Sequence, residues 1–158
     1  MSKIVLKRLH LPDESATRQL GAALGALLHA GDVVALQGDL GAGKTTLARG
    51  LIQAAMGKED PVLSPTFTMV QTYGEGRSSP MIWHFDLYRT SHPEELAELG
   101  WEDALAEGIS LVEWPERAAD ALPEDTLWLT LEEEGGGRQA TFAGPAEWAE
   151  RLAASGIA

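Results

Sequence analysis

One short segment constrains the fold of this chain more than any other. Gly38-Asp39-Leu40-Gly41-Ala42-Gly43-Lys44-Thr45-Thr46 follows the pattern G-x-x-x-x-G-K-S/T. Glycines allow the backbone to curl until successive N–H groups face one point, and a following helix directs its positive end there. In such a loop Lys44 reaches the β- and γ-phosphates of a nucleotide, while the Thr45 hydroxyl ligates Mg²⁺. The pattern therefore predicts a strand, a phosphate-binding loop and a helix in succession.

The residues on both sides of this loop have the required patterns. Val33-Val34-Ala35-Leu36 is a short apolar run rich in β-branched residues, typical of a buried strand. After the loop, apolar residues recur at helical spacing at Leu47, Leu51, Ile52 and Ala55. This context favours a phosphate-binding loop over an ordinary glycine turn that opens a helix.

The composition is that of one globular domain. The chain has 158 residues, of which 44% are hydrophobic, and this is enough apolar material for a single core. We therefore expect one domain over residues 1–158. The sequence has no cysteine, which excludes disulfides, thiolate metal sites and a cysteine nucleophile.

The sequence argues against a membrane location. Its longest run without a polar residue, 20–28, is far shorter than the ~20 residues that span a bilayer. Residues 1–6 lead directly into a strand-like pattern rather than a signal peptide. We expect a cytoplasmic protein with no membrane partner.

The chain is strongly acidic, with a formal net charge of −12 and its 12 Lys and Arg residues scattered along the sequence. Proteins that bind nucleic acid on their own usually carry a basic face, because phosphate neutralisation supplies much of the affinity. The charge therefore disfavours direct binding of RNA or DNA and suits a basic protein partner. Because Mg-ATP is also anionic, its attraction to this acidic chain must be local. Lys44, the amides of the loop and the metal would supply it.

The rest of the chain alternates between helical and strand patterns. Asp13 or Ser15 is placed to cap a helix that ends near Gly31, and Gly57 is a typical stop for the helix after the loop. Further predicted elements are a hairpin of strands 66–73 and 81–85, helices over about 93–100 and 102–106, a strand over 109–112, a short helix from 115 to about 123, a hairpin of strands 126–131 and 139–142, and a helix over about 146–154. This order predicts a single-domain P-loop NTPase of the α/β class, with a mixed β-sheet flanked by helices.

Two acidic residues are candidates for holding a metal. Mg²⁺ prefers hard oxygen ligands and keeps several waters, so we expect a carboxylate at a strand end beside the loop. Glu113 follows the apolar run 109–112, and Asp86 follows the run 81–85, which contains the polar His84. The alternative for each is a solvated acid at a strand end.

Three further residues have two interpretations each. Thr66 either contacts the γ-phosphate and Mg²⁺, as in nucleotide switches, or begins a strand. Trp114, next to Glu113, is either a packing residue or a sensor of the nucleotide site. His84 fits a strand residue better than a catalytic base.

Taken in order, these motifs resemble those of a known family. After the loop come Ser64-Pro65-Thr66, His84-Phe85-Asp86-Leu87-Tyr88-Arg89 and Val112-Glu113-Trp114-Pro115. Together they resemble the bacterial TsaE (YjeE) family of small P-loop ATPases. The resemblance extends from about residue 11 to residues 137–138, nearly the whole chain. The later motifs make it specific, since the loop alone occurs in many families.

The resemblance implies a site for ATP and Mg²⁺. In it, Thr45 and Glu113 hold the metal, while Asp86 and Thr66 take part with Lys44 in hydrolysis or switching. The residues that the resemblance places at the nucleotide are Glu14, Thr17, Gly41, Ala42, Gly43, Lys44, Thr45, Thr46 and Arg138. We expect two further residues there, Gly38 as part of the loop motif and Trp114 as the neighbour of Glu113.

The resemblance also implies partners. Family members act with the proteins TsaB and TsaD, which place a threonylcarbamoyl group on N6 of adenosine 37 in tRNA. The ATP cycle supports that enzyme and does not perform the transfer. We therefore expect a slow, partner-stimulated ATPase that meets tRNA only through the complex. The alternatives are a small-molecule kinase, although the short 74–79 connection carries only Arg77 for a lid, and a nucleotide-binding subunit without hydrolysis.

Overall fold

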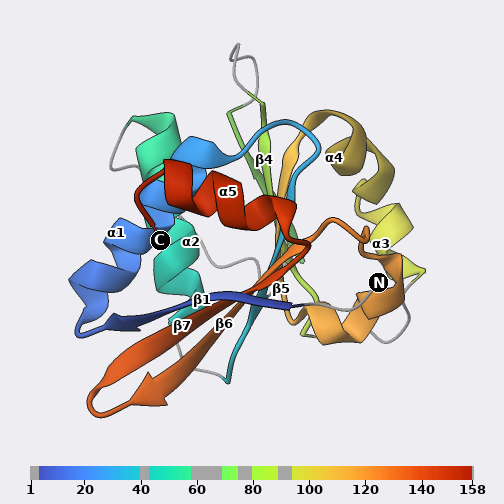
Figure 1. The fold of residues 1–158 in the computed structure, drawn as a ribbon. Helices are drawn as coiled ribbons and strands as arrows, with labels where there is room; N and C mark the ends of the chain where they lie inside the picture. The colour runs from blue at the N-terminus through green and yellow to red at the C-terminus, as the bar shows by residue number, and fades with distance from the viewer. Residues whose placement is uncertain (1–3, 40–42, 58–68, 75–79, 89–93, 158) are drawn as a thin grey trace.

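All strands in the described part of the chain belong to one seven-stranded sheet, in the order β1-β7-β6-β2-β5-β4-β3 (Figure 1). The computed structural model describes residues 4–39, 43–57, 69–74, 80–88 and 94–157. The strands are β1 (Ile4–Leu11), β2 (Val33–Gln37), β3 (Val70–Tyr73), β4 (Ile82–Asp86), β5 (Ile109–Glu113), β6 (Leu127–Glu134) and β7 (Gly137–Gly144). The helices are α1 (Glu14–Leu27), α2 (Lys44–Met56), α3 (Glu95–Glu98), α4 (Trp101–Glu107), the 3₁₀-helix η1 (Pro115–Ala121) and α5 (Glu147–Ala154).

The sheet is mixed, as predicted. Strand β2 pairs in parallel with β5 and β6, and β4 pairs in parallel with β5. The pairs β1–β7, β6–β7 and β3–β4 are antiparallel. The parallel strands thus occupy the centre, and the antiparallel hairpins extend the sheet toward both edges.

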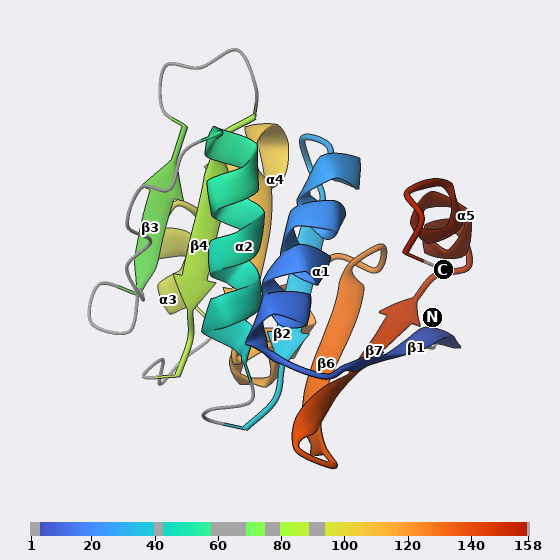
Figure 2. The ribbon, with the colours of Figure 1, turned by 90° about the vertical axis from the view of Figure 1, so that its left-hand side faces the viewer.

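Helices cover both faces of the sheet. Figure 2 shows α1 and α2 side by side on one face, with α3 and α4 on the other. Side chains of β2 alternate between two cores: Val34 and Leu36 pack with α1 and α2, whereas Val33 packs with the residues of α3 and α4. Burial on both faces explains why the strand before the glycine loop is a continuous apolar run.

Helices α1 and α2 approach closely because each presents a glycine to the other. A Cβ atom at Gly21 would collide with the carbonyl oxygen of Leu47, and one at Gly50 would collide with that of Arg18. Side chains at these positions would push the helices apart. This packing fixes where α2 begins relative to the sheet.

The element boundaries differ from the predicted ones where long-range pairing or caps decide them. The Asp13 carboxylate caps α1 as predicted, but the helix ends at Leu27 rather than near Gly31. Strands β6 and β7 extend to the turn at Gly135 and Gly136, since both glycines adopt positive φ. The short helix after Trp114 is a 3₁₀-helix.

The two predicted hairpins are present, formed by β3 with β4 and by β6 with β7. The first residues predicted for the β3 strand, including Thr66, lie outside the described residues. Among the described helices, none has the length and apolar character needed to cross a membrane. The predicted α/β class with a mixed sheet flanked by helices is therefore confirmed.

Candidate functional site

Two buried carboxylates meet at the carboxyl ends of the parallel strands. Asp86 is the last residue of β4 and Glu113 the last of β5, and they are partners in the strand register. Side chains alternate along a strand, so both point to the face that α1 and α2 cover. Their exposed fractions are only 5% and 3%. The alternative of a solvated acid at a strand end is therefore wrong for both residues.

The N-terminus of α2 lies beside these strand ends. Gly43 precedes the helix with φ +104°, a left-handed conformation that favours glycine, and no side chain caps the helix. The N–H groups of the first turn have no intrahelical acceptor and carry the positive end of the helix dipole. This end of α2 is thus suited to an anion.

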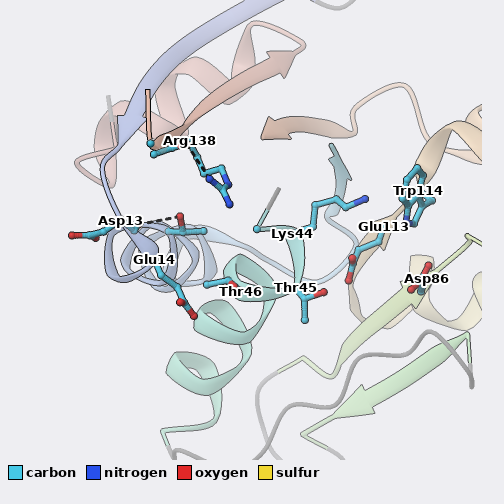
Figure 3. Close-up of a pocket in the computed structure, with 13 residues that line it drawn as sticks. Asp13, Glu14, Lys44, Thr45, Thr46, Asp86, Glu113, Trp114 and Arg138 are labelled. Atoms are coloured by element: carbon cyan, nitrogen blue, oxygen red, sulfur yellow. Dashed lines mark hydrogen bonds between the residues drawn. The ribbon is translucent and has the colours of Figure 1, made fainter. Parts of the chain in front are cut away.

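A cavity of about 470 Å³ connects these groups (Figure 3). Its lining residues are Asp13, Glu14, Thr17, Gly43, Lys44, Thr45, Thr46, Asp86, Glu113, Trp114, Gly136, Gly137 and Arg138. The cavity therefore brings together most residues predicted for the site. Gly38 is not a lining residue, and Gly41, Ala42 and Thr66 lie outside the described residues.

The Lys44 side chain lies between the backbone of Gly38 and the aromatic ring of Trp114. Its Nζ donates a hydrogen bond to the Gly38 carbonyl oxygen at 2.6 Å and lies 3.6 Å from the centroid of the Trp114 ring. Burial lowers the pKa of the Lys44 ammonium from its usual value, and nearby carboxylates, Glu113 foremost, act in the opposite direction. Lys44 thus places a buried positive charge in the cavity.

Trp114 contributes its ring directly to the cavity. It directly follows β5 and adopts a left-handed conformation with φ +58°, which is uncommon for a residue other than glycine. Its ring also contacts Tyr88 edge to face at 4.8 Å between centroids. Trp114 thus packs against Tyr88, as one of the two interpretations expected, and it also contacts Lys44 in the cavity; its role as a sensor of the nucleotide site stays a prediction.

Sequence reasoning missed the partner of Glu113. Nε2 of His84, a fully buried residue of β4, lies within hydrogen-bond distance of Oε2 of Glu113, at 2.5 Å. His84 is a strand residue, as predicted, yet its side chain faces the candidate site. The available signal was its spacing: residues 84 and 86 lie two apart on one strand, so they share a face.

The opposite wall of the cavity is more exposed. Asp13 and Glu14, at the start of α1, are exposed, whereas Arg138 at the start of β7 is half-buried. An Arg138 N–H donates to the Gly137 carbonyl oxygen at 3.0 Å. Figure 3 shows the Arg138 side chain extending from β7 into the space beside Lys44 and Thr46. Arg138 thus adds a second positively charged side chain to the cavity, near the start of α2.

Comparisons with known proteins identify the family that this chain resembles. A family model described as "Threonylcarbamoyl adenosine biosynthesis protein TsaE" matches residues 11–140. A protein of Rickettsia felis named tRNA threonylcarbamoyladenosine biosynthesis protein TsaE is 41% identical over 124 residues, covering 78% of this chain and 71% of the relative. A protein of the same name from Haemophilus influenzae is 39% identical over 129 residues, covering 78% and 80% of the two chains.

A solved structure shares the fold. The crystal structure of Bacillus subtilis YdiB aligns with a TM-score of 0.75 and 27% identity, covering 97% of this chain and 93% of that one. The matched range 11–140 contains every residue that lines the cavity, from Asp13 to Arg138. The resemblance found in the sequence is thus confirmed, and the chain belongs to the TsaE family.

Proposed function

We propose that this chain is a Mg²⁺-dependent ATP-binding protein and slow ATPase of the P-loop type, formed as a single domain over residues 1–158. One observation carries the proposal: Lys44, Thr45 and the start of α2 share a cavity with Glu113 and Asp86. A helix N-terminus with a lysine attracts phosphate groups. Carboxylate and hydroxyl oxygens beside it are the ligand type that Mg²⁺ prefers.

The cavity suits a nucleotide in size, and its charge suits a nucleotide that carries a divalent cation. Small-molecule sites measure about 300–1,000 Å³, and this cavity measures about 470 Å³. Four acidic residues line it, Asp13, Glu14, Asp86 and Glu113, against the two cations Lys44 and Arg138. Because carboxylates repel an anionic triphosphate, the proposal requires a divalent cation between the phosphates and the strand ends.

Each predicted residue has a distinct role in this proposal. Thr45 and Glu113 hold Mg²⁺, which when bound neutralises charge that develops on the phosphates. Lys44 contacts the β- and γ-phosphates, and Asp86 orients the attacking water. Thr66 contacts the γ-phosphate and couples hydrolysis to switching. The remaining proposed nucleotide contacts are Glu14, Gly38, Gly41, Ala42, Gly43, Thr46, Trp114 and Arg138.

We further propose that this ATPase acts in threonylcarbamoyl modification of tRNA adenosine 37. The names of the relatives support this role, as does membership of the family. In the proposal the chain is an auxiliary subunit of TsaD- and TsaB-type partners in the cytoplasm and meets tRNA only through them. The acidic chain, with a net charge of −12, suits protein partners better than direct tRNA binding.

The test is phosphate release from ATP, measured for the chain alone, with TsaB and TsaD partners, and with partners plus tRNA. We expect slow, Mg²⁺-dependent release by the chain alone and a marked increase with partners. Fast release that partners leave unaltered would contradict the auxiliary role. Nucleotide binding without phosphate release under every condition would instead identify a non-hydrolysing subunit.

A further inference from the structure

We propose that His84 is a positioning residue that holds the Glu113 carboxylate in the orientation needed to bind Mg²⁺. This inference rests on the proposed role of Glu113 as a metal ligand. It goes beyond that role because His84 belongs to a different strand and does not line the cavity. The two residues are 29 positions apart in sequence and meet only through the pairing of β4 with β5.

The geometry identifies which atoms interact. The His84 ring is fully buried, and the Glu113 side chain is 4% exposed. A carboxylate that binds Mg²⁺ is ionised and can only accept, so in the proposed role Nε2 of His84 carries the hydrogen and donates it to Oε2 of Glu113, 2.5 Å away. The contact occupies one carboxylate oxygen and leaves the other for the cavity. In Figure 3 the Glu113 carboxylate points toward the side of α2 that carries Thr45.

A structural role alone does not account for a histidine at this place. The neighbouring strand residues Ile82 and Phe85 are buried and apolar, and a leucine would avoid the desolvation of an imidazole. The Nδ1 atom of His84 has no hydrogen-bond partner among the described residues. The ring therefore has one polar contact in the described structure, and that contact is Glu113.

Orientation matters because Mg²⁺ demands near-ideal octahedral geometry. A glutamate has a long side chain with several rotatable bonds, and fixing it before the metal arrives lowers the entropic cost of binding. Outer-shell partners of this kind typically change metal affinity about 10–100-fold when they are removed. Asp86 receives comparable support from the chain, since its Oδ1 accepts from the Tyr88 N–H at 2.9 Å.

The experiment compares His84→Leu, His84→Asn and His84→Gln with the parent chain. Glutamine places an N–H donor near the position of Nε2, whereas asparagine places its amide near Nδ1 and leucine has no donor. Ser110→Ala is the matched control, because Ser110 is a fully buried polar residue of β5 without a hydrogen-bond partner in the described part, on the opposite face. For each protein, ADP affinity is titrated calorimetrically in EDTA and across a Mg²⁺ series, and Mn²⁺ bound with ADP is counted by EPR.

We expect His84→Leu and His84→Asn to raise the half-saturating Mg²⁺ concentration about 10-fold, with ADP affinity in EDTA unchanged. His84→Gln should recover most of the loss, and Ser110→Ala should match the parent chain.

If His84→Leu does not fold, the asparagine and glutamine variants decide alone. Equal Mg²⁺ dependence in the asparagine, glutamine and parent proteins would overturn the inference. A parent chain that binds no ADP, or binds it equally with and without Mg²⁺, would instead overturn the proposed function.

Discussion

The parallel and antiparallel parts of the sheet form two unlike walls of the same cavity. On the parallel side, β4 and β5 end in Asp86 and Glu113, which are buried and have fixed partners. On the antiparallel side, the β6–β7 turn and the start of α1 contribute Arg138, Asp13 and Glu14, which are partly or fully exposed.

This contrast follows from how the strands are connected. Parallel neighbours bring their carboxyl ends to one edge, where the helix that follows β2 also begins. An antiparallel hairpin presents only its turn there, and a turn remains in contact with water. We therefore expect substitutions on the parallel wall to change chemistry and metal binding strongly, and those on the antiparallel wall to change affinity slightly.

The largest effect is expected for Asp86→Asn. Asparagine keeps an oxygen to accept from the Tyr88 N–H but has no negative charge to orient and polarise water. Phosphate release in the presence of partners should fall about 10²–10⁴-fold, while ATP affinity changes little. Stopped-flow phosphate detection and calorimetry measure the two quantities. Normal turnover by this variant would show that Asp86 is not catalytic.

The two positively charged residues of the cavity allow a comparison of its two sides, because Lys44 begins α2 beside the parallel wall and Arg138 belongs to the antiparallel wall. Lys44 is buried and bonded to Gly38, so Lys44→Ala should weaken ATP binding roughly 10–100-fold, the equivalent of one strong charged hydrogen bond. Arg138 is partly exposed, so Arg138→Ala should weaken it about fivefold or less. Calorimetric titration at one salt concentration tests both. Equal losses of ATP affinity in the two variants would contradict the expected difference between the two sides of the cavity.

A third prediction concerns the packing that positions α2. Gly50→Ala places a Cβ against the Arg18 backbone, whereas Gly25→Ala meets mainly the Leu51 side chain, which can move. We expect Gly50→Ala to lower the free energy of unfolding by about 1–3 kcal/mol and Gly25→Ala to lower it less. Urea denaturation followed by circular dichroism gives both values. The reverse order would mean that α1 and α2 do not need this close approach.

The smallest effect is a pH dependence. Burial lowers the pKa of Lys44, so in the free protein this side chain loses its proton at a lower pH than an exposed lysine does. Only the charged form attracts phosphate, and ATP affinity should therefore decline as the pH rises through that lowered pKa. The Lys44→Arg variant should show no decline, because a guanidinium stays charged. The same decline in both proteins would assign it to another group.

Local sequence patterns predicted the centre of the fold well. The apolar run before the glycine segment and the helical spacing after it gave β2 and α2, because propensity and periodicity act within a few residues. The order of the strands was not predictable in this way. The position of β5 between β2 and β4 depends on pairing between residues far apart in sequence.

In the candidate site, too, features set by local sequence were predicted and features set by long-range contacts were not. Asp86 and Glu113 were found because each ends an apolar run, and Lys44 and Thr45 because they belong to a contiguous motif. The hydrogen bond between His84 and Glu113 was not found, since it depends on the register of two strands. The contact of Lys44 with Trp114 likewise depends on tertiary packing.

The central claim is that a nucleotide and its metal bind between the start of α2 and the ends of β4 and β5. Crystals grown with ADP and Mn²⁺, with diffraction data collected at the manganese absorption edge, test it most directly. We predict an anomalous density peak beside the Thr45 hydroxyl and the Glu113 carboxylate, with the diphosphate over the first turn of α2. A manganese peak away from both residues, or a nucleotide bound outside this cavity, would contradict the claim.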